Sequence, residues 1–390
     1  MQRYLVVTAA IWLAGAAVLR TVVVPAQLCP AVTSAAAHEA ARLSMDWIAR
    51  VQRPDGSYLY EYDRDSGAES PGYNAVRHAG VTMSLYLLAA AGDRDALAPA
   101  DRAQGYMDAH MVRRDGWAAF QSAQTGEAEL GASALMLAGL AQRRLATADE
   151  RYDTLMREAG RFLLLMQRPD GSFLDTWRAV TGAPDPTSTS RYATGEAFWA
   201  LALLHRAFPG EGWDRPARLV ADYLSLRRDA AEHFKFPPWA DQWAAYGLAE
   251  MADWPLNDAN IAYAKTLAAR FGFLVRVEAQ RRDSRFSKLL QGRQARAAGL
   301  GTWVEGLASL WRLAQADPRM GDLGPKIGER AVCSAGMLAA RQVRTPGATL
   351  DGVDVIRGAW FSEGKTRMDD QQHALSGLLR TEAILKAGGR

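Results

Sequence analysis

The sequence contains little cysteine: of its 390 residues only two, Cys29 and Cys333, are of this type. Two cysteines are too few for a Cys-rich zinc site or for the disulfide framework of a small secreted domain. The chain also shows no phosphate-binding glycine loop, no Ser-His-Asp order and no His/Cys set with metal-ligand spacing. We therefore expect neither a metal nor another cofactor.

An excess of charge of one sign is also lacking. Lys and Arg total 46, Asp and Glu total 43, and the basic residues are scattered along the chain. Because a nucleic-acid-binding surface needs a basic face or stripe, nucleic acid is not an expected partner. The mean hydropathy of -0.18 excludes a multi-span membrane protein. With 49% hydrophobic and 9% aromatic residues, the composition is that of a packed globular protein.

One long apolar run stands near the N-terminus, where residues 4–19 carry no charge and Arg3 and Arg20 flank them. The run is short for a spanning helix and long for the apolar part of a signal peptide, and Ala35 and Ala37 offer a cleavage site. We expect residues 1–37 to be an export signal or membrane anchor with a linker, and residues 38–390 to be the folded domain. The expected location is exported, periplasmic or otherwise extracytoplasmic, either free or anchored to the inner membrane. The alternative is a buried N-terminal helix; cleavage after Ala37 would leave Cys333 unpaired.

A turn motif recurs at near-constant intervals. The segment at 52–58 (QRPDGSY) returns at 167–173 (QRPDGSF), and shorter or degraded copies are centred on residues 115, 229, 283 and 345. A helix-period run precedes each copy, including one expected over 107–112, and a helix that is apolar on nearly every face follows it, as in buried helices. Six outer amphipathic and six inner apolar helices predict an all-α fold, an (α/α)6 toroid of six helical hairpins. We interpret the motif itself as structural.

The Gln-x-x-x-Gly-x-aromatic pattern at 52–58 and 167–173 resembles the turn motif of α-toroids. Those toroids include the squalene-cyclase and prenyltransferase group and the six-hairpin glycosidase superfamily. The resemblance extends over the chain after residue 38, at the level of repeat and turn. It implies the fold, and a fold alone does not imply a function.

Polar residues interrupt the apolar pattern of the inner helices near each N-terminus. Carboxylates stand there in five of the six units, which favours catalytic use of at least two of them. The alternative is that each acid caps its helix or complements the helix dipole. We favour Asp370, and the full set of candidate catalytic residues is Glu129, Glu196, Glu305, Asp369, Asp370, His78 and His373.

Aromatic and polar side chains also gather in the loops before the inner helices. Aromatic faces stack on sugar rings, so an acid-rich cleft beside them suits a glycan, and it suits an isoprenoid chain almost as well. Arg77 is a candidate ion-pair partner for Asp369 or Asp370, or a clamp for an acidic sugar. The candidate substrate-binding residues are Tyr73, Asn74, Arg77, Trp117, Tyr192, Trp239, Asp241, Trp303, Trp360 and Gln372.

A glycosidase needs one protonated carboxyl group and one ionised carboxylate, and a ring of carboxylates at a half-buried opening drives their pKa values apart. The sequence therefore predicts an exported glycoside hydrolase that acts on a polysaccharide or oligosaccharide. Three alternatives stay open. One is a terpene-cyclase-like enzyme, although residues 368–370 contain only a fragment of the acid motif of those enzymes. Another is a non-catalytic glycan-binding or scaffold toroid of an envelope polysaccharide system. The third is a polysaccharide lyase or uronate epimerase that uses Tyr73, Asn74, Arg77, His78 and His373.

Overall fold

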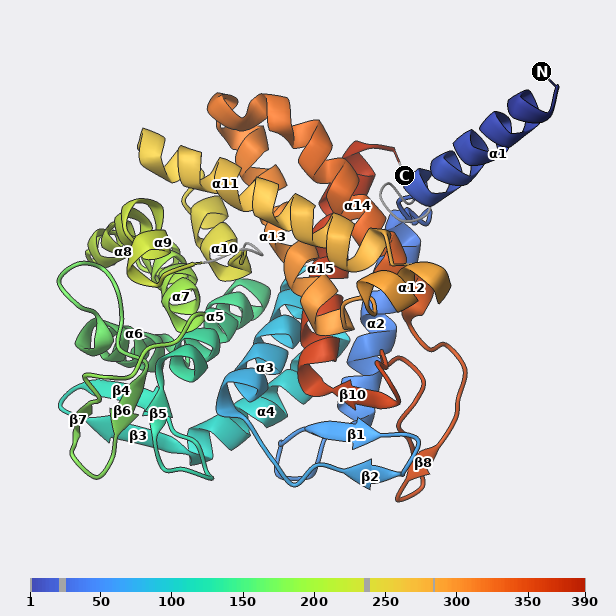
Figure 1. The fold of residues 1–390 in the computed structure, drawn as a ribbon. Helices are drawn as coiled ribbons and strands as arrows, with labels where there is room; N and C mark the ends of the chain where they lie inside the picture. Colours follow the sequence, from blue (N-terminus) through green and yellow to red (C-terminus); the bar gives the residue numbers. More distant parts are fainter. Residues whose placement is uncertain (1, 21–25, 235–238, 283–284, 390) are drawn as a thin grey trace.

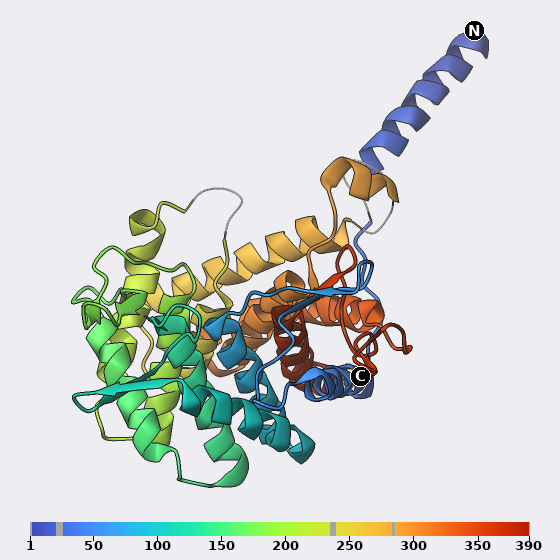
Figure 2. The ribbon, with the colours of Figure 1, turned by 90° about the horizontal axis from the view of Figure 1, so that it is seen from below.

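The helices form a closed double ring. The structure, a computed structural model, describes residues 2–20, 26–234, 239–282 and 285–389 (Figures 1 and 2). The inner helices contact one another in the order α3, α5, α7, α10, α13, α15, and α15 returns to α3. This ring is the predicted (α/α)6 toroid. The inner helices are α3 (Ala75–Ala90), α5 (Leu130–Thr147), α7 (Ala193–Ala207), α10 (Gln242–Glu250), α13 (Ala297–Ala316) and α15 (Met368–Ala387).

The outer helices cover this ring, and all but α14 bury mainly one face; in α14 residues 331–338 are buried on every side. They are α2 (Ser34–Val51), α4 (Leu97–Ala109), α6 (Asp153–Met166), α8 (Asp214–Leu226), α11 (Asp258–Val275) and α14 (Gly324–Arg341). Inner helices are buried nearly all round, as their composition predicts. Small residues permit the close packing: a Cβ atom on Gly247 would lie 2.3 Å from the Phe198 ring, and one on Gly306 would lie 2.2 Å from the Phe271 ring.

Short strands, which the sequence did not predict, lie in the loops between helices. The expected helix over 107–112 is wrong, because α4 ends at Ala109 and β3 begins at Met111. In two three-stranded sheets, of order β10-β1-β2 and β5-β6-β7, the strand before an inner helix pairs with the loop of the next hairpin. The strands are β1 (Glu61–Asp63), β2 (Ala68–Glu69), β3 (Met111–Arg114), β4 (Trp117–Phe120), β5 (Ala128–Glu129), β6 (Thr176–Arg178), β7 (Ala183–Pro184), β8 (Thr349–Leu350), β9 (Val353–Asp354) and β10 (Lys365–Arg367).

Further short helices lie in the connections between the long ones, one near residue 95 and the others between residues 228 and 323. They are η2 (Arg94–Ala96), α9 (Arg228–Ala231), η3 (Arg276–Gln280), α12 (Arg285–Gln291) and η4 (Pro318–Leu323). Both full copies of the turn motif are structural. Gly56 and Gly171 have φ of +89° and +93°, and a Cβ atom on either would lie 2.2 Å from a carbonyl oxygen of an outer helix. The copy at residue 283 lies outside the described residues.

The N-terminal helix α1 (Gln2–Val18) projects away from the ring in both views (Figures 1 and 2). Its described side chains are exposed. Among the described residues, no helix combines the length and the apolar composition needed to cross a membrane. Residue 1 and residues 21–25 of the expected export segment are outside the described part of the chain. The predicted domain boundary at residue 37 falls within the first turn of α2, which Thr33 caps through its hydroxyl group.

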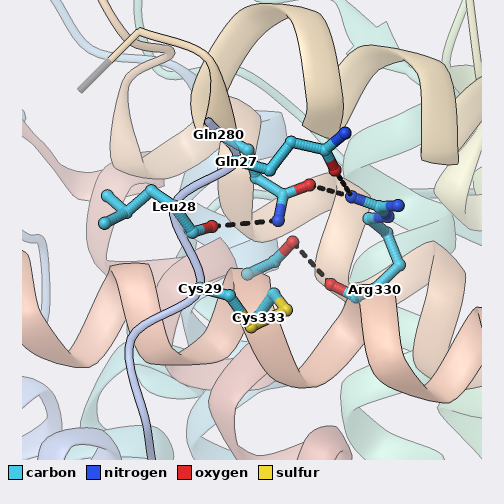
Figure 3. Close-up of a disulfide and its surroundings, with 7 residues drawn as sticks. Gln27, Leu28, Cys29, Gln280, Arg330 and Cys333 are labelled. Atoms are coloured by element: carbon cyan, nitrogen blue, oxygen red, sulfur yellow. Dashed lines mark hydrogen bonds between the residues drawn. A yellow bond between two sulfur atoms is a disulfide. The ribbon is translucent and has the colours of Figure 1, made fainter. Parts of the chain in front are cut away.

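A disulfide joins the segment before α2 to the outer ring. Cys29 is bonded to Cys333 of α14, although the sequence offered no reason to pair the two (Figure 3). Hydrogen bonds flank the bond: the backbone N–H of Leu28 donates to the carbonyl of Gln280 at 2.9 Å, and the Gln280 amide donates back to the carbonyl of Leu28 at 2.9 Å. The sequence analysis did not predict this disulfide, and the segment from Leu28 onward belongs to the folded body.

Candidate functional site

A cavity of about 860 Å³ opens where the N-termini of the six inner helices converge. Each inner helix contributes to its wall, because the polar residues of the repeat stand in the first turns of these helices or directly before them. The cavity therefore lies at the polar N-terminal ends of the inner helices, which the sequence analysis singled out and which we call the rim. The candidate residues that line it are Asn74, Arg77, Glu129, Tyr192, Glu196, Trp239, Trp303, Asp369, Gln372 and His373.

Three carboxyl groups, Glu129, Asp175 and Glu196, form one part of the wall, which we call the carboxylate cluster. Burial raises the pKa of Glu196 well above its usual value, and the negative charges of Asp241, Asp175 and Glu129 raise it further. Burial is also the main reason that the pKa values of Glu129 and Asp175 are raised. No cation among the described residues forms an ion pair with any of the three, so the cluster favours the protonated form.

Strand pairing and a glycine assemble this cluster. Glu129 ends β5 and lies opposite Thr176 of β6, which brings it beside Asp175, the residue before β6. Glu129 precedes α5 without capping it. Gly131, in the first turn of α5, leaves room for Glu196, because a Cβ atom there would lie 2.1 Å from the Glu196 Oε2 atom.

Two guanidinium groups and one carboxylate, those of Arg77, Arg367 and Asp369, form a second part of the wall, the arginine cluster. Asp369 Oδ2 lies 3.3 Å from Arg77 Nε and 3.1 Å from Arg367 Nη2, which confirms the predicted pairing of Arg77 with Asp369. The second oxygen, Oδ1, and the Nε of Arg367 are buried without a hydrogen-bond partner among the described residues. The cluster thus has two guanidinium groups for one carboxylate, and one oxygen of that carboxylate has no hydrogen-bond partner among the described residues.

His373 lines the cavity four residues after Asp369 on α15. Its Nδ1 atom lies 2.9 Å from Oε2 of Glu305, a fully buried residue that also accepts a hydrogen bond from the Ser376 hydroxyl. Burial lowers the pKa of His373, but the charge and hydrogen bond of Glu305, together with the charges of Asp369 and Asp370, make the net shift upward. Glu305 therefore lies behind His373, with no place in the cavity wall, and it orients the imidazole so that Nε2 is the remaining ring nitrogen.

Asp370, the favoured catalytic residue, does not line the cavity. It is 1% exposed and accepts hydrogen bonds from Arg296 Nη2 at 2.6 Å and from the backbone N–H groups of Ala298 and Arg367 at 3.0 and 3.1 Å. Asp241 is likewise buried and does not line the cavity, since it caps α10 and pairs with Arg228. For these two acids the structure supports the capping alternative.

The other candidate residues outside the cavity pack against the core or form hydrogen bonds within it. His78 is fully buried, with Nδ1 2.6 Å from the Tyr73 hydroxyl and Nε2 3.0 Å from a backbone carbonyl, and burial lowers its pKa to about 4. His78 and His373 therefore do not form a paired site. Tyr73 lines a separate pocket of about 370 Å³. Trp117 packs on other aromatic rings, and the Trp360 indole N–H donates to a backbone carbonyl.

Several cavity residues were not among the candidate site residues, including Tyr60, Asp175, Arg191 and Arg367. For two of them a signal existed. Tyr60 and Asp175 each stand four residues after the glycine of a full turn motif, so they are equivalent positions of the repeat. Aligning the loops as well as the helices would have placed both at the cavity.

No family model matches the chain, and no curated protein matches it. Solved structures do. The cellobiose 2-epimerase from Spirochaeta thermophila is 14% identical, with 90% of this chain and 97% of that chain covered and a TM-score of 0.61. An unsaturated glucuronyl hydrolase specific for heparin is 12% identical (90% and 98% covered, TM-score 0.60), and a GH76 α-mannanase from Bacteroides thetaiotaomicron is 9% identical (91% and 97%, TM-score 0.59). The likeness shows the fold alone: the protein is an (α/α)6 toroid.

Proposed function

We propose that the protein is a glycoside hydrolase in which Glu196 is the general acid. The observation that carries the proposal is a buried carboxyl group that faces the cavity, has a raised pKa and pairs with no cation among the described residues. A general acid must hold its proton at the working pH and release it to the leaving group, and this environment serves that role.

Asp369 is the ionised partner in this proposal. Its Oδ2 atom pairs with Arg77 and Arg367, while its Oδ1 atom has no hydrogen-bond partner among the described residues. Glu196 gives its proton to the glycosidic oxygen as the bond from that oxygen to the anomeric carbon breaks. A water molecule supplies the new oxygen on the anomeric carbon, and its proton passes to Asp369, so that each carboxyl group ends in the other's protonation state.

The remaining wall supports a sugar substrate. Tyr192, Trp239 and Trp303 present aromatic rings, and Asn74 and Gln372 present amide groups, a combination suited to the C–H faces and hydroxyl groups of sugars. The three structural neighbours are named for activity on cellobiose, heparin or mannan, which also favours a carbohydrate substrate.

A second candidate function is sugar epimerisation or isomerisation. It is favoured by the His373–Glu305 pair, because a buried carboxylate that orients a cavity-facing imidazole suits a base that removes a proton from carbon. In that case His373 takes the proton, and the sugar backbone stays intact.

One experiment separates these functions. The purified chain is incubated with a panel of polysaccharides and oligosaccharides in water enriched in heavy oxygen, and in parallel in deuterium oxide, and the products are weighed by mass spectrometry. Cleavage with uptake of one heavy oxygen supports the hydrolase. Deuterium uptake at carbon without cleavage moves the function to His373, unsaturated products mean a lyase, and binding without any reaction makes the toroid a receptor.

We also propose that the protein works outside the cytoplasm. Disulfides persist in oxidising compartments, and the Cys29–Cys333 bond fits such a place. Cleavage at Ala35–Ala37 would discard Cys29, so we expect the mature chain to keep residue 29. N-terminal sequencing of the exported protein, with thiol alkylation before and after reduction, checks both statements. A mature chain that begins after residue 37, or two free thiols in the native protein, would contradict them.

A further inference from the structure

The positive charges of the cavity are not explained by the hydrolysis of a neutral sugar. Arg77, Arg191 and Arg367 all line the cavity, and the arginine cluster has two guanidinium groups for the single carboxylate of Asp369. Arg191 forms no ion pair with any described carboxylate. Arg191 is exposed, so its guanidinium group can meet an oppositely charged group of a ligand that enters the cavity.

Arg191 and the acids of the carboxylate cluster line the same cavity without pairing with one another. Arg191 stands only five residues before Glu196 in the chain, and both side chains line the same cavity, yet they form no ion pair. The three acids of the carboxylate cluster lie in one part of the wall, and the guanidinium group of Arg191 has no ion-pair partner among the described residues. A substrate with a carboxylate on one side of its glycosidic bond matches this separation.

Aromatic rings surround Arg191. Its guanidinium carbon lies 5.8 Å from the ring centroids of both Phe234 and Trp239, and the rings of Trp239 and Tyr192 meet edge to face at 5.5 Å. Such contacts restrain a long side chain without using its N–H groups. The planar guanidinium then offers a fork that fits a carboxylate, beside aromatic faces that fit the ring carrying it.

We propose that the substrate is an acidic glycan and that Arg191 binds the carboxylate of a uronic acid residue, with Tyr192 and Trp239 against the sugar ring. This inference rests on the proposed carbohydrate substrate, and it adds the substrate class and a specificity residue. The excess positive charge of the arginine cluster strengthens the same selection, because it attracts an anionic chain into the cavity.

The test compares matched probes and variants by isothermal titration calorimetry. The probes are tetrasaccharides that contain glucuronate, galacturonate or mannuronate, each also prepared with its carboxyl groups chemically reduced to neutral alcohols. We expect the intact chain to bind at least one acidic probe about 10–100-fold more tightly than its reduced counterpart. Arg191→Gln should remove that preference, and Arg191→Lys should restore part of it. Arg215→Gln, at an exposed position of α8, is the control and should behave as wild type.

The outcomes separate this inference from the proposed hydrolysis. Equal binding of acidic and reduced probes, no binding of any acidic probe, or a preference that survives Arg191→Gln overturns the inference, even if neutral glycans are cleaved. A preference lost only in Arg191→Gln supports it, even if no probe is cleaved and the hydrolase proposal fails.

Discussion

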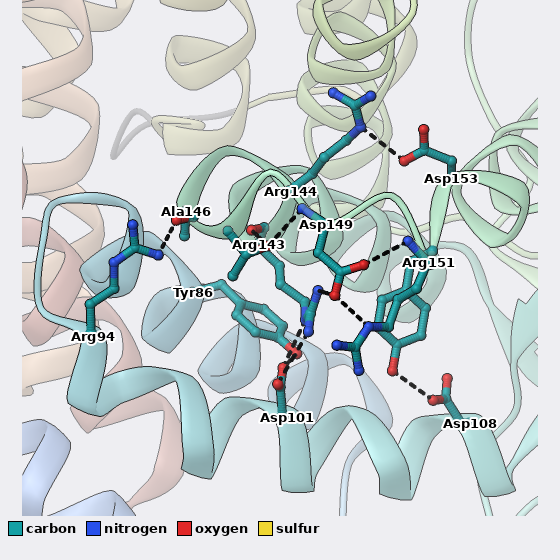
Figure 4. A network of polar contacts seen from close by, with 12 residues as sticks. Tyr86, Arg94, Asp101, Asp108, Arg143, Arg144, Ala146, Asp149, Arg151 and Asp153 are labelled. Atoms are coloured by element: carbon teal, nitrogen blue, oxygen red, sulfur yellow. Dashed lines mark hydrogen bonds and ion pairs between the residues drawn. The ribbon is translucent and has the colours of Figure 1, made fainter.

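The two ends of helix α5 differ in whether their charged side chains have ion-pair partners. At its C-terminal end the nearly buried guanidinium group of Arg143 lies 2.9 Å from Asp101 and 3.1 Å from Asp149 (Figure 4). At its N-terminal end Glu129 has no cationic partner among the described residues and belongs to the carboxylate cluster with two further acids. Charges that hold a fold are paired, and charges left unpaired at a cavity perturb their own pKa values, which is the usual condition of catalytic groups.

The same contrast exists within the rim itself. Asp370 and Glu196 both stand in the first turn of an inner helix, and both are almost fully buried. Asp370 receives Arg296 and two backbone N–H groups, whereas Glu196 receives no described cation and faces the cavity. Asp370 is therefore a structural group, whereas Glu196 stays free for the role of general acid that we propose, and the difference lies in the partners that face each acid.

The largest expected effect is on turnover. Glu196→Gln should lower kcat by about 10²–10⁴-fold, because the amide cannot donate a proton to the leaving oxygen. The melting temperature should change little, since a neutral carboxyl group is replaced by a neutral amide. Glu127→Gln is the matched control, because Glu127 lies near the cluster but pairs with Arg178 and does not line the cavity. Full activity in Glu196→Gln would remove this residue from the mechanism.

A smaller loss of activity is expected from a change that moves Glu196 without altering it. Gly131→Ala places a methyl group where the Glu196 carboxyl oxygen lies, and displacing a catalytic group by about 1 Å costs about 10²-fold in rate. The helix should tolerate alanine, so stability should hold. Gly105→Ala, at an open helical site in α4, is the control and should raise stability by up to about 1 kcal/mol. Unchanged kcat in Gly131→Ala would mean that the position of Glu196 is not critical.

Removal of the ion pairs at the C-terminal end of α5 should lower the stability of the fold without lowering activity. Arg143→Met leaves Asp101 and Asp149 without their shared cation, and we expect a loss of about 1–3 kcal/mol because both carboxylates are partly solvated. Urea denaturation measures the loss, and kcat on the folded variant should equal that of wild type. A drop in kcat without a drop in stability would break the distinction between the two ends.

The smallest effect is a slope of stability with pH. The folded-state pKa values of Glu129, Asp175 and Glu196 are raised, so these groups stabilise the fold fully below their ordinary pKa values, and the contribution is lost as pH rises through the raised ones. The raised pKa of His373 acts in the same direction at higher pH. Urea denaturation between about pH 5 and 8 should therefore show falling stability, with a shallower slope in Glu196→Gln. An identical slope in both proteins would show that Glu196 is ionised throughout.

The sequence by itself determined the ring. Six copies of a helix, a turn and an apolar helix allow only an arrangement in which the inner helices bury every face, and a glycine with positive φ fixes each full turn. The same periodicity located the rim, because it placed polar residues at matching depth in the inner helices.

Only the tertiary structure decided which rim residues face a ligand. Arg296 lies 74 residues from Asp370, and Cys29 lies 304 residues from Cys333. Glu129 meets Asp175 through a strand pair too short to leave a pattern in the sequence. Local periodicity gives the depth of a side chain in its helix, whereas its ionisation and its use depend on partners that other hairpins bring beside it. That is why the rim was predicted correctly while its favoured acid, Asp370, is sealed in an ion pair.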